Sequence, residues 1–287
     1  VSQPTLSVAV KKLEDELGVT LFERRPKEIA ITAVGERLIE QARRVLGETT
    51  QLRQMAQRAQ DPFNGPLRVG AIHTVGPYLF PHLIPVLRER APRMPLIVEE
   101  SVTARLGERL RQGEVDAIIV ALPFEAPGVE TRVLYSEPFR VVVPLGHRWQ
   151  DAEQVPADAL AQENVLLLGP GHCFRDQVLA ACPDCASSLA DQPGPDRALE
   201  GSSLETIRYM VASGMGITVL PSSAVATEPH SGALLAARPF AAPEPRRQVA
   251  LAWRSSFPRA EAIDALEHAI RACGLASVDF DAPASAA

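Results

Sequence analysis

The sequence predicts an α/β protein with an N-terminal helical segment, a long connecting helix, and a larger part made of two α/β lobes with a cleft between them. Three features of the 287-residue chain predict this fold. Residues 1–60 carry apolar side chains at helical spacing, and residues 61–66 (DPFNGP) break that pattern. Short apolar strands then alternate with helical segments, as in a sheet of parallel strands.

Residues 1–31 read as one helix followed by a short hairpin. Ser2 is a natural N-cap, Pro4 lies in the first turn, and Gly18 ends the helix. The apolar stripe of this helix consists of Leu6, Val10, Leu13 and Leu17. RRPKEIAIT then places a basic turn between two short extended pieces, which is typical of a β-wing. Because the stripe needs partners and none lies upstream, we expect the chain to begin inside its first domain and to lack that domain's N-terminal part.

A second helical pattern starts after Thr32, which is a good N-cap, and runs to about residue 60. At about 1.5 Å per residue, this helix is about 40 Å long. Such a length exceeds what a compact domain needs. We therefore expect a linker or dimerisation helix over residues 32–61.

Residues 66–275 should form the larger part. The first strands are expected at 67–72, 96–100 and 116–122, with helices at 78–92 and 103–113. A second set begins near 139–145 and includes strands at 164–169 and 216–221 and a helix at 204–214. A strand at 248–254 and a helix at 259–273 close the fold. We expect lobes of roughly 66–137 plus 240–275, and 138–239.

Composition and charge narrow the classes of function. The net charge of −6 argues against a chain that coats nucleic acid, but residues 1–60 hold ten Lys and Arg against eight Asp and Glu. The chain has no apolar run of about 18 residues and no signal peptide, so we expect no membrane association and a cytoplasmic location. Structural disulfides are rare there, so the cluster of Cys173, Cys182 and Cys185 indicates redox or metal chemistry.

The N-terminal run carries a resemblance to a known family. SQPTLS puts small polar side chains at a helix start, which suits DNA bases and phosphates, although it is equally an ordinary helix N-terminus. Residues 2–36 as a whole resemble the winged helix-turn-helix of LysR-type transcriptional regulators. This resemblance implies a helix that enters the major groove of promoter DNA and a long helix that mediates dimerisation. The DNA-binding residues that it implies are Ser2, Gln3, Pro4, Thr5, Ser7, Lys11, Arg24 and Arg25.

The larger part resembles the OxyR subfamily, the hydrogen peroxide sensors of that family. The resemblance is carried by GPLRVGAIHTVGPYLFPHLIP, GHCFRDQ, SLETIRYMVASGMGITVLP and PEPRR. It implies a two-lobed effector domain like a periplasmic binding protein, and an activator of oxidative-stress genes rather than an enzyme. Cys173 matches the cysteine that reacts with peroxide, and Cys182 matches the partner with which it forms a disulfide. The partners implied are double-stranded promoter DNA, hydrogen peroxide, further copies in a homodimer or homotetramer, RNA polymerase and cellular thiol reductants, with no cofactor and no metal.

The neighbours of Cys173 suit a reactive thiol. A helix start and the adjacent basic side chains stabilise a thiolate, which is the reacting form. By the resemblance, two threonines face the sensing cysteine. The predicted thiolate and peroxide environment comprises Thr74, Thr103, His172, Arg175, Asp176 and Arg247. Plainer interpretations exist, with Cys173 as a small buried apolar residue and the threonines as helix caps.

Spacing gives an argument about the disulfide. If the residues from Arg175 to Cys182 are helical, Cys173 lies roughly 13 Å from Cys182, against a limit of roughly 7 Å for the Cα atoms of a disulfide. The two cysteines therefore cannot bond unless the segment unfolds locally. A disulfide would then hold a different fold of this segment, which makes it a redox switch.

Other interpretations stay open at this point. The CxxC formed by Cys182 and Cys185 can close its own disulfide, offer Cys185 as the alternative partner of Cys173, or supply two zinc ligands. The alternative functions are a LysR-type regulator that binds a small organic effector in the inter-lobe cleft and a thiol peroxidase. Cys273 is expected to be structural.

Overall fold

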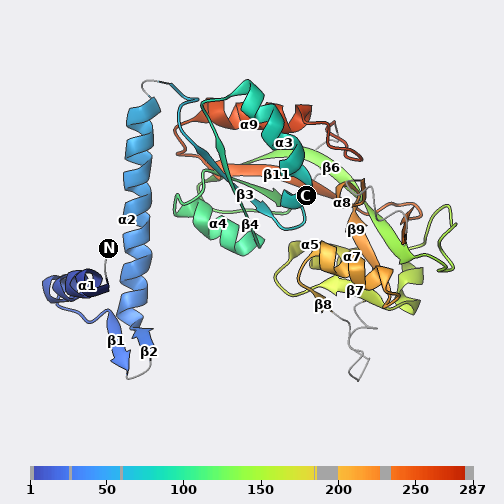
Figure 1. The fold of residues 1–287 in the computed structure, drawn as a ribbon, viewed down its shortest axis with the longest axis horizontal. Coiled ribbons are helices and arrows are strands. Elements are labelled where there is room, and N and C mark those ends of the chain that lie inside the picture. The colour runs from blue at the N-terminus through green and yellow to red at the C-terminus, as the bar shows by residue number, and fades with distance from the viewer. Residues whose placement is uncertain are drawn as a thin grey trace. The chain divides into compact units, whose positions relative to one another are not determined.

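The structure is a computed structural model that describes residues 3–25, 28–58, 61–183, 185, 200–226 and 234–281. Its contacts divide the chain into two units, residues 1–53 and 54–287. Figure 1 shows the course of the chain through both units.

The first unit contains the predicted helix and hairpin. Helix α1 spans Gln3–Leu17 and ends at Gly18, whose φ of 66° lies in the left-handed region that favours glycine. Strands β1 (Phe22–Arg25) and β2 (Glu28–Ile31) pair in antiparallel fashion. The Glu14 carboxylate accepts hydrogen bonds from the N–H groups of Leu21 and Phe22, at 2.6 and 3.0 Å, and so ties the hairpin to the helix.

The long helix follows as predicted. Helix α2 spans Ala33–Arg58, and the hydroxyl of Thr32 accepts a hydrogen bond from the N–H of Gly35 at 2.9 Å, which caps the helix. Val45, Leu46 and Leu52 of this helix are 56%, 66% and 69% exposed, so α2 presents apolar surface along much of its length. No helix of the described residues is long and apolar enough to span a membrane.

The second unit begins with the predicted parallel strands. Strand β3 (Leu67–Ile72) lies between β4 (Leu96–Ser101) and β5 (Ala117–Ala121), and all three are parallel. The helices of this region are α3 (Gly76–Arg90), α4 (Thr103–Arg111) and α9 (Ala260–Ala272). Figure 1 shows α3 and α9 over one side of these strands and α4 over the other.

The sheet as a whole is mixed, which differs from the expected run of parallel strands. Strand β6 (Val129–Pro144) pairs in antiparallel fashion with β11 (Arg246–Arg254) through its first half and with β9 (Ile217–Pro221) through its second. The sequence predicted this strand only from Phe139. The earlier half was missed because Glu130, Arg132 and Glu137 interrupt the apolar pattern.

The remaining elements complete the second half of this unit. Its strands are β7 (Val165–Leu168), β8 (Glu200–Gly201) and β10 (Leu235–Pro239). Its helices are the 3-10 helix η1 (Asp158–Gln162), α5 (Cys173–Ala181), α7 (Leu204–Ala212) and α8 (Ser222–Ala226). Strand β7 is parallel to both β8 and β9. Strand β10, which the sequence did not predict, pairs with the end of β6.

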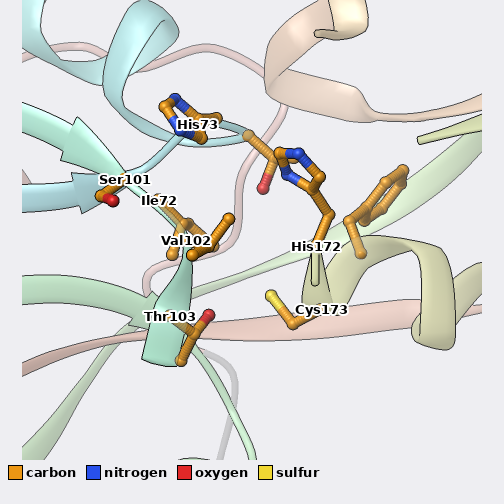
Figure 2. A pocket seen from close by; sticks show the side chains of 9 residues that line it. Ile72, His73, Ser101, Val102, Thr103, His172 and Cys173 are labelled. Carbon is orange, nitrogen blue, oxygen red and sulfur yellow. The ribbon is translucent and has the colours of Figure 1, made fainter. Parts of the chain in front are cut away.

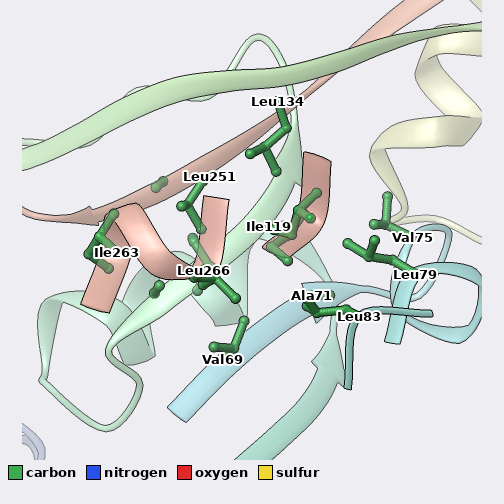
Figure 3. Packing of buried hydrophobic residues seen from close by; sticks show 14 of the residues in the cluster. Val69, Ala71, Val75, Leu79, Leu83, Ile119, Leu134, Leu251, Ile263 and Leu266 are labelled. Carbon is green, nitrogen blue, oxygen red and sulfur yellow. The ribbon is translucent and has the colours of Figure 1, made fainter. Parts of the chain in front are cut away.

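Buried apolar side chains of the second unit form two clusters, which confirms the two-lobed α/β fold. The first cluster packs β3, β5 and β11 against α3 and α9, and Figure 3 shows Val69, Leu79 and Leu266 among its members. The second cluster contains Phe139, Phe174 and Val178 and surrounds β7 and β9. Tyr78 of α3 belongs to the second cluster and donates a hydrogen bond to Glu205 of α7 at 2.6 Å, so the two lobes are joined by buried contacts as well as by strand β6.

Candidate functional site

A small pocket lies between the lobes where three strands have just ended. It is lined by residues 72–74 at the end of β3, 101–103 at the end of β4, and 172–174 at the start of α5. Its volume is about 180 Å³ including its opening to solvent. The enclosed part has room for about one water-sized molecule. The carboxyl ends of parallel strands are the usual place for a ligand in an open α/β sheet. Figure 2 shows Cys173 and Thr103 facing one another across this pocket.

The thiol is placed by the turn that leads from β7 into α5. Gly171 has a φ of 92°, so only a glycine turns the chain here without strain. His172 follows in an extended conformation as the N-cap, and Cys173 is the first residue of the helix. Its thiol is half-buried and unbonded. The unpaired N–H groups of a first helical turn favour a negative charge there, so the position suits a thiolate.

Three residues with hydroxyl groups line the same pocket, Thr74, Ser101 and Thr103, and neither threonine caps a helix. The N-caps of α3 and α4 are Val75 and Val102, and neither helix has a side-chain cap. The hydroxyl of Thr103 is buried and has no hydrogen-bond partner. A buried polar group without a partner is unfavourable unless a small molecule supplies the missing bond. The two threonines are therefore available to a small polar ligand rather than used by the helix ends.

Thr74 is fixed by a buried ion pair. The Arg247 guanidinium donates to the hydroxyl and to the carbonyl of Thr74, both at 2.8 Å. It also pairs with Glu137 at 2.8 Å, and both of these side chains are completely buried. Glu137 in turn accepts a hydrogen bond from the N–H of Ser223 at 3.0 Å. The charge of Arg247 is thus compensated by Glu137, while its guanidinium lies 5.0 Å from the ring centre of Phe174, next to the thiol.

Two imidazole rings border the pocket. The rings of His73 and His172 are 5.6 Å apart, and Nδ1 of His73 lies 3.7 Å from a carboxylate oxygen of Glu100. Burial lowers the pKa of His172, and the nearby His73 lowers it further. The lowered pKa favours the neutral imidazole of His172 over the imidazolium beside the thiol.

Two predicted members of the environment lie outside the pocket. The guanidinium of Arg175 donates to the carbonyl of Leu168 at 2.8 Å, at the end of β7. Asp176 is exposed in the first turn of α5, where an acidic group complements the helix dipole. Of the predicted environment, the structure brings together Thr74, Thr103 and His172 around Cys173, with Arg247 behind Thr74.

The cysteines lie at the two ends of α5. Cys182 is the C-cap of the helix that Cys173 begins, and it is bonded to Cys185 in a disulfide. Both residues of this disulfide are buried in the cluster of the second lobe. Cys273 is also buried, and its thiol donates to the carbonyl of Ile270 at 3.0 Å. Among the described residues, no three His, Cys, Asp or Glu side chains gather as a metal site requires.

The predicted DNA-binding residues are partly described. Thr5, Ser7 and Lys11 are exposed on α1. Ser2 lies outside the described residues, as do the side chains of Gln3, Pro4, Arg24 and Arg25.

Sequence reasoning missed three members of the site, His73, Ser101 and Glu137. His73 directly precedes Thr74, and its place just after a strand was the signal that could have found it. Glu137 gave no local signal, because its role depends on an arginine 110 residues away.

Two family descriptions match the chain. Residues 1–36 match the "Bacterial regulatory helix-turn-helix protein, lysR family", and residues 60–273 match the "LysR substrate binding domain". Together they cover both units of the structure.

Individual relatives of the chain agree with these family matches. The DNA-binding transcriptional dual regulator OxyR of Escherichia coli (strain K12) is 41% identical over 272 residues, which are 95% of this chain and 87% of that protein. The structure of a full-length OxyR variant from Pseudomonas aeruginosa has a TM-score of 0.77 and 49% identity, covering 99% of this chain and 90% of that one. The structure of an H2O2-bound OxyR variant from Corynebacterium glutamicum has a TM-score of 0.68 and 32% identity, covering 95% of this chain and 84% of that one. The chain belongs to the LysR family of bacterial regulators, in its OxyR branch.

Proposed function

We propose that this protein is a transcriptional activator that senses hydrogen peroxide through Cys173. The observation that carries the proposal is the pocket itself, in which a thiol at a helix start faces the buried, unpartnered hydroxyl of Thr103. Relatives at 41% identity are named as OxyR and as hydrogen peroxide-inducible genes activators. The small enclosed volume favours a molecule of the size of peroxide over an organic effector, since sites for such effectors occupy about 300–1,000 Å³.

In the first step, the Cys173 thiolate attacks one oxygen of peroxide and the O–O bond breaks. The sulfur becomes a sulfenic acid, and the second oxygen leaves as hydroxide and takes up a proton to become water. Thr103 is placed to hydrogen-bond the peroxide because nothing else occupies its hydroxyl. Thr74 accepts from Arg247, so its own O–H is directed elsewhere and can donate to the oxygen that leaves.

In the second step, which starts from the chain with Cys182 and Cys185 both reduced, the sulfenic acid condenses with the thiol of Cys182 to form a disulfide and water. Helix α5 separates the two cysteines by nine residues, about 13 Å at 1.5 Å per residue, so it must open before they can bond. This opening is the switch. The resulting change in the effector domain would alter how protomers pair and which DNA contacts they make.

On the DNA side, α1 with its exposed Thr5, Ser7 and Lys11 serves as the recognition helix, and the β1–β2 hairpin serves as the wing. The exposed apolar side chains of α2 support dimerisation along that helix. We expect double-stranded promoter DNA, further copies of the chain in a dimer or tetramer, RNA polymerase and cellular thiol reductants as partners, and a cytoplasmic location.

The experiment that tests this proposal compares the wild type with Cys173→Ser, using Cys273→Ser as the control. Peroxide should lower the count of free thiols and shift the DNA footprint in the wild type and the control. Neither change should occur in Cys173→Ser. A peroxide response that survives in Cys173→Ser would refute the assignment of the sensing thiol. Stabilisation by an organic effector without loss of thiols would identify the other kind of LysR-type regulator.

A further inference from the structure

Helix α5 carries an unbonded thiol at one end and a disulfide at the other. Cys173 begins the helix and packs against the apolar cluster of the first lobe. Cys182 caps the helix and, bonded to Cys185, lies in the cluster of the second lobe. A cytoplasmic protein of this class has no structural need for such a short cross-link, since a loop closed by three residues restricts the unfolded chain little. The presence of Cys185 beside Cys182 therefore needs another explanation.

The turn after α5 allows Cys185 to reach Cys182 without disturbing the helix. The N–H of Cys182 donates to the carbonyl of Val178 at 3.0 Å, which is the last hydrogen bond of the helix. The N–H of Cys185 donates to the carbonyl of Cys182 at 3.1 Å, and the two Cα atoms are 5.4 Å apart. This separation is ordinary for a disulfide. A bond between Cys182 and Cys185 thus exists with α5 intact, whereas a bond between Cys173 and Cys182 requires α5 to open.

We infer that Cys185 is a third redox-active residue, which takes Cys182 away from the sensing cysteine and so ends the peroxide-induced state from within. The inference rests on the proposed function, in which peroxide first produces the Cys173–Cys182 disulfide. The Cys185 thiolate then attacks Sγ of Cys182. The S–S bond to Cys173 breaks, a bond between Cys182 and Cys185 forms, and Cys173 leaves as a thiolate. No electrons enter or leave the chain in this exchange, because the oxidising equivalent moves from one pair of sulfurs to another.

The fold drives the exchange in this direction. Once Cys173 is released, α5 can form again and bury Phe174 and Val178, which are each 2% exposed in the structure. Cys182 and Cys185 are also 2% exposed, so the new disulfide is sheltered from thiol reductants in solution. The structure, with Cys173 unbonded and Cys182 bonded to Cys185, is the end state of this sequence. The active conformation is therefore transient, and its lifetime is set by Cys185.

The test uses the full chain, reduced with a phosphine and freed of reductant, in four forms: wild type, Cys185→Ser, Cys173→Ser, and Cys273→Ser as the matched control. Each receives one equivalent of hydrogen peroxide, is quenched with acid and an alkylating agent at successive times, and is analysed by mass spectrometry of linked peptides. In the wild type and the control, the Cys173–Cys182 link should appear first and then give way to the Cys182–Cys185 link, as the Cys173 thiol returns. In Cys185→Ser, the Cys173–Cys182 link and the shifted DNA footprint should last at least about tenfold longer.

Two results would overturn the inference. One is a Cys173–Cys182 link that is equally long-lived in the wild type and in Cys185→Ser. The other is a Cys182–Cys185 link that forms at the wild-type rate in Cys173→Ser, since the CxxC would then be oxidised without the sensing thiol. Failure of the proposed function looks different, because no variant would then form any peroxide-dependent link to Cys173.

Discussion

If α5 must open before Cys173 can bond to Cys182, then loosening α5 should speed the disulfide. Ala180→Gly is the change of choice, because Ala180 is exposed in the last turn of the helix and its side chain makes no buried contact that the change would remove. Glycine destabilises a helix by about 1 kcal/mol relative to alanine. At that value, the open fraction of α5 rises roughly fivefold, and the rate of ring closure should rise by the same factor.

The assay follows this closure in the Cys185→Ser background, so that the product accumulates. Saturating peroxide converts Cys173 to the sulfenic acid first, and linked peptides are then counted over time. Ala272→Gly is the matched control, since Ala272 is also an exposed alanine in a last helical turn, that of α9. With Ala272→Gly, the Cys173–Cys182 disulfide should form at the same rate as in Cys185→Ser alone. An unchanged rate in Ala180→Gly, or an equal increase in Ala272→Gly, would show that opening of α5 does not limit the reaction.

Three further predictions follow from the site and the core. Arg247→Met leaves Glu137 charged and without its ion-pair partner in the interior, so the free energy of unfolding should fall by about 3–5 kcal/mol in urea titrations. Adding Glu137→Leu to this variant should recover most of the lost free energy of unfolding. Thr103→Val removes an unpartnered buried hydroxyl, so it should slow the reaction of the sensing thiol with peroxide by about tenfold or more without loss of stability. Burial raises the pKa of Glu267, but its arginine partners, chiefly Arg132, outweigh burial and hold that pKa below its usual value. Glu267→Gln should therefore lower stability by about 1 kcal/mol at pH 7. The difference should begin to shrink as pH falls through the ordinary glutamate pKa of about 4.3, and vanish only at the lower pH where the carboxyl of the folded wild type is protonated too.

The sequence predicted the elements whose signals are local. Strand β3 was predicted with the bounds observed, because LRVGAI is apolar and is closed on both sides by turn residues. A helix was predicted to follow the turn at GHC, and α5 begins there, at Cys173. Thr32 was predicted as a cap and is one. In each case the relevant interactions lie within a few residues along the chain, which is the range over which periodicity and capping act.

The features that were not predicted depend on distant partners. The first half of β6 lacks an apolar pattern, and it is a strand because β11 pairs with it. The compensation of Arg247 by Glu137 joins residues on two neighbouring strands that lie 110 positions apart in sequence. Sequence spacing established that Cys173 and Cys182 are too far apart to bond across a helix, but it left open which cysteine Cys182 bonds to. The structure shows that bond to Cys185, which is the partner that leaves α5 intact.

The contacts of α5 explain how a change of one bond reaches the rest of the effector domain. Phe174 packs edge-on against Phe139 of β6 at 5.1 Å and lies beneath Arg247, and the side-chain amide of Gln177 donates to the carbonyl of Leu122 in the first lobe at 3.2 Å. Opening α5 removes these contacts and exposes Phe174 and Val178, at about 1.5–3 kcal/mol for each buried side chain. The helical form is thus strongly preferred while Cys173 is reduced. In the proposed switch, the Cys173–Cys182 bond would hold the helix open and keep these contacts between α5 and both lobes broken. Oxidation of one sulfur would in this way change the relation of the lobes.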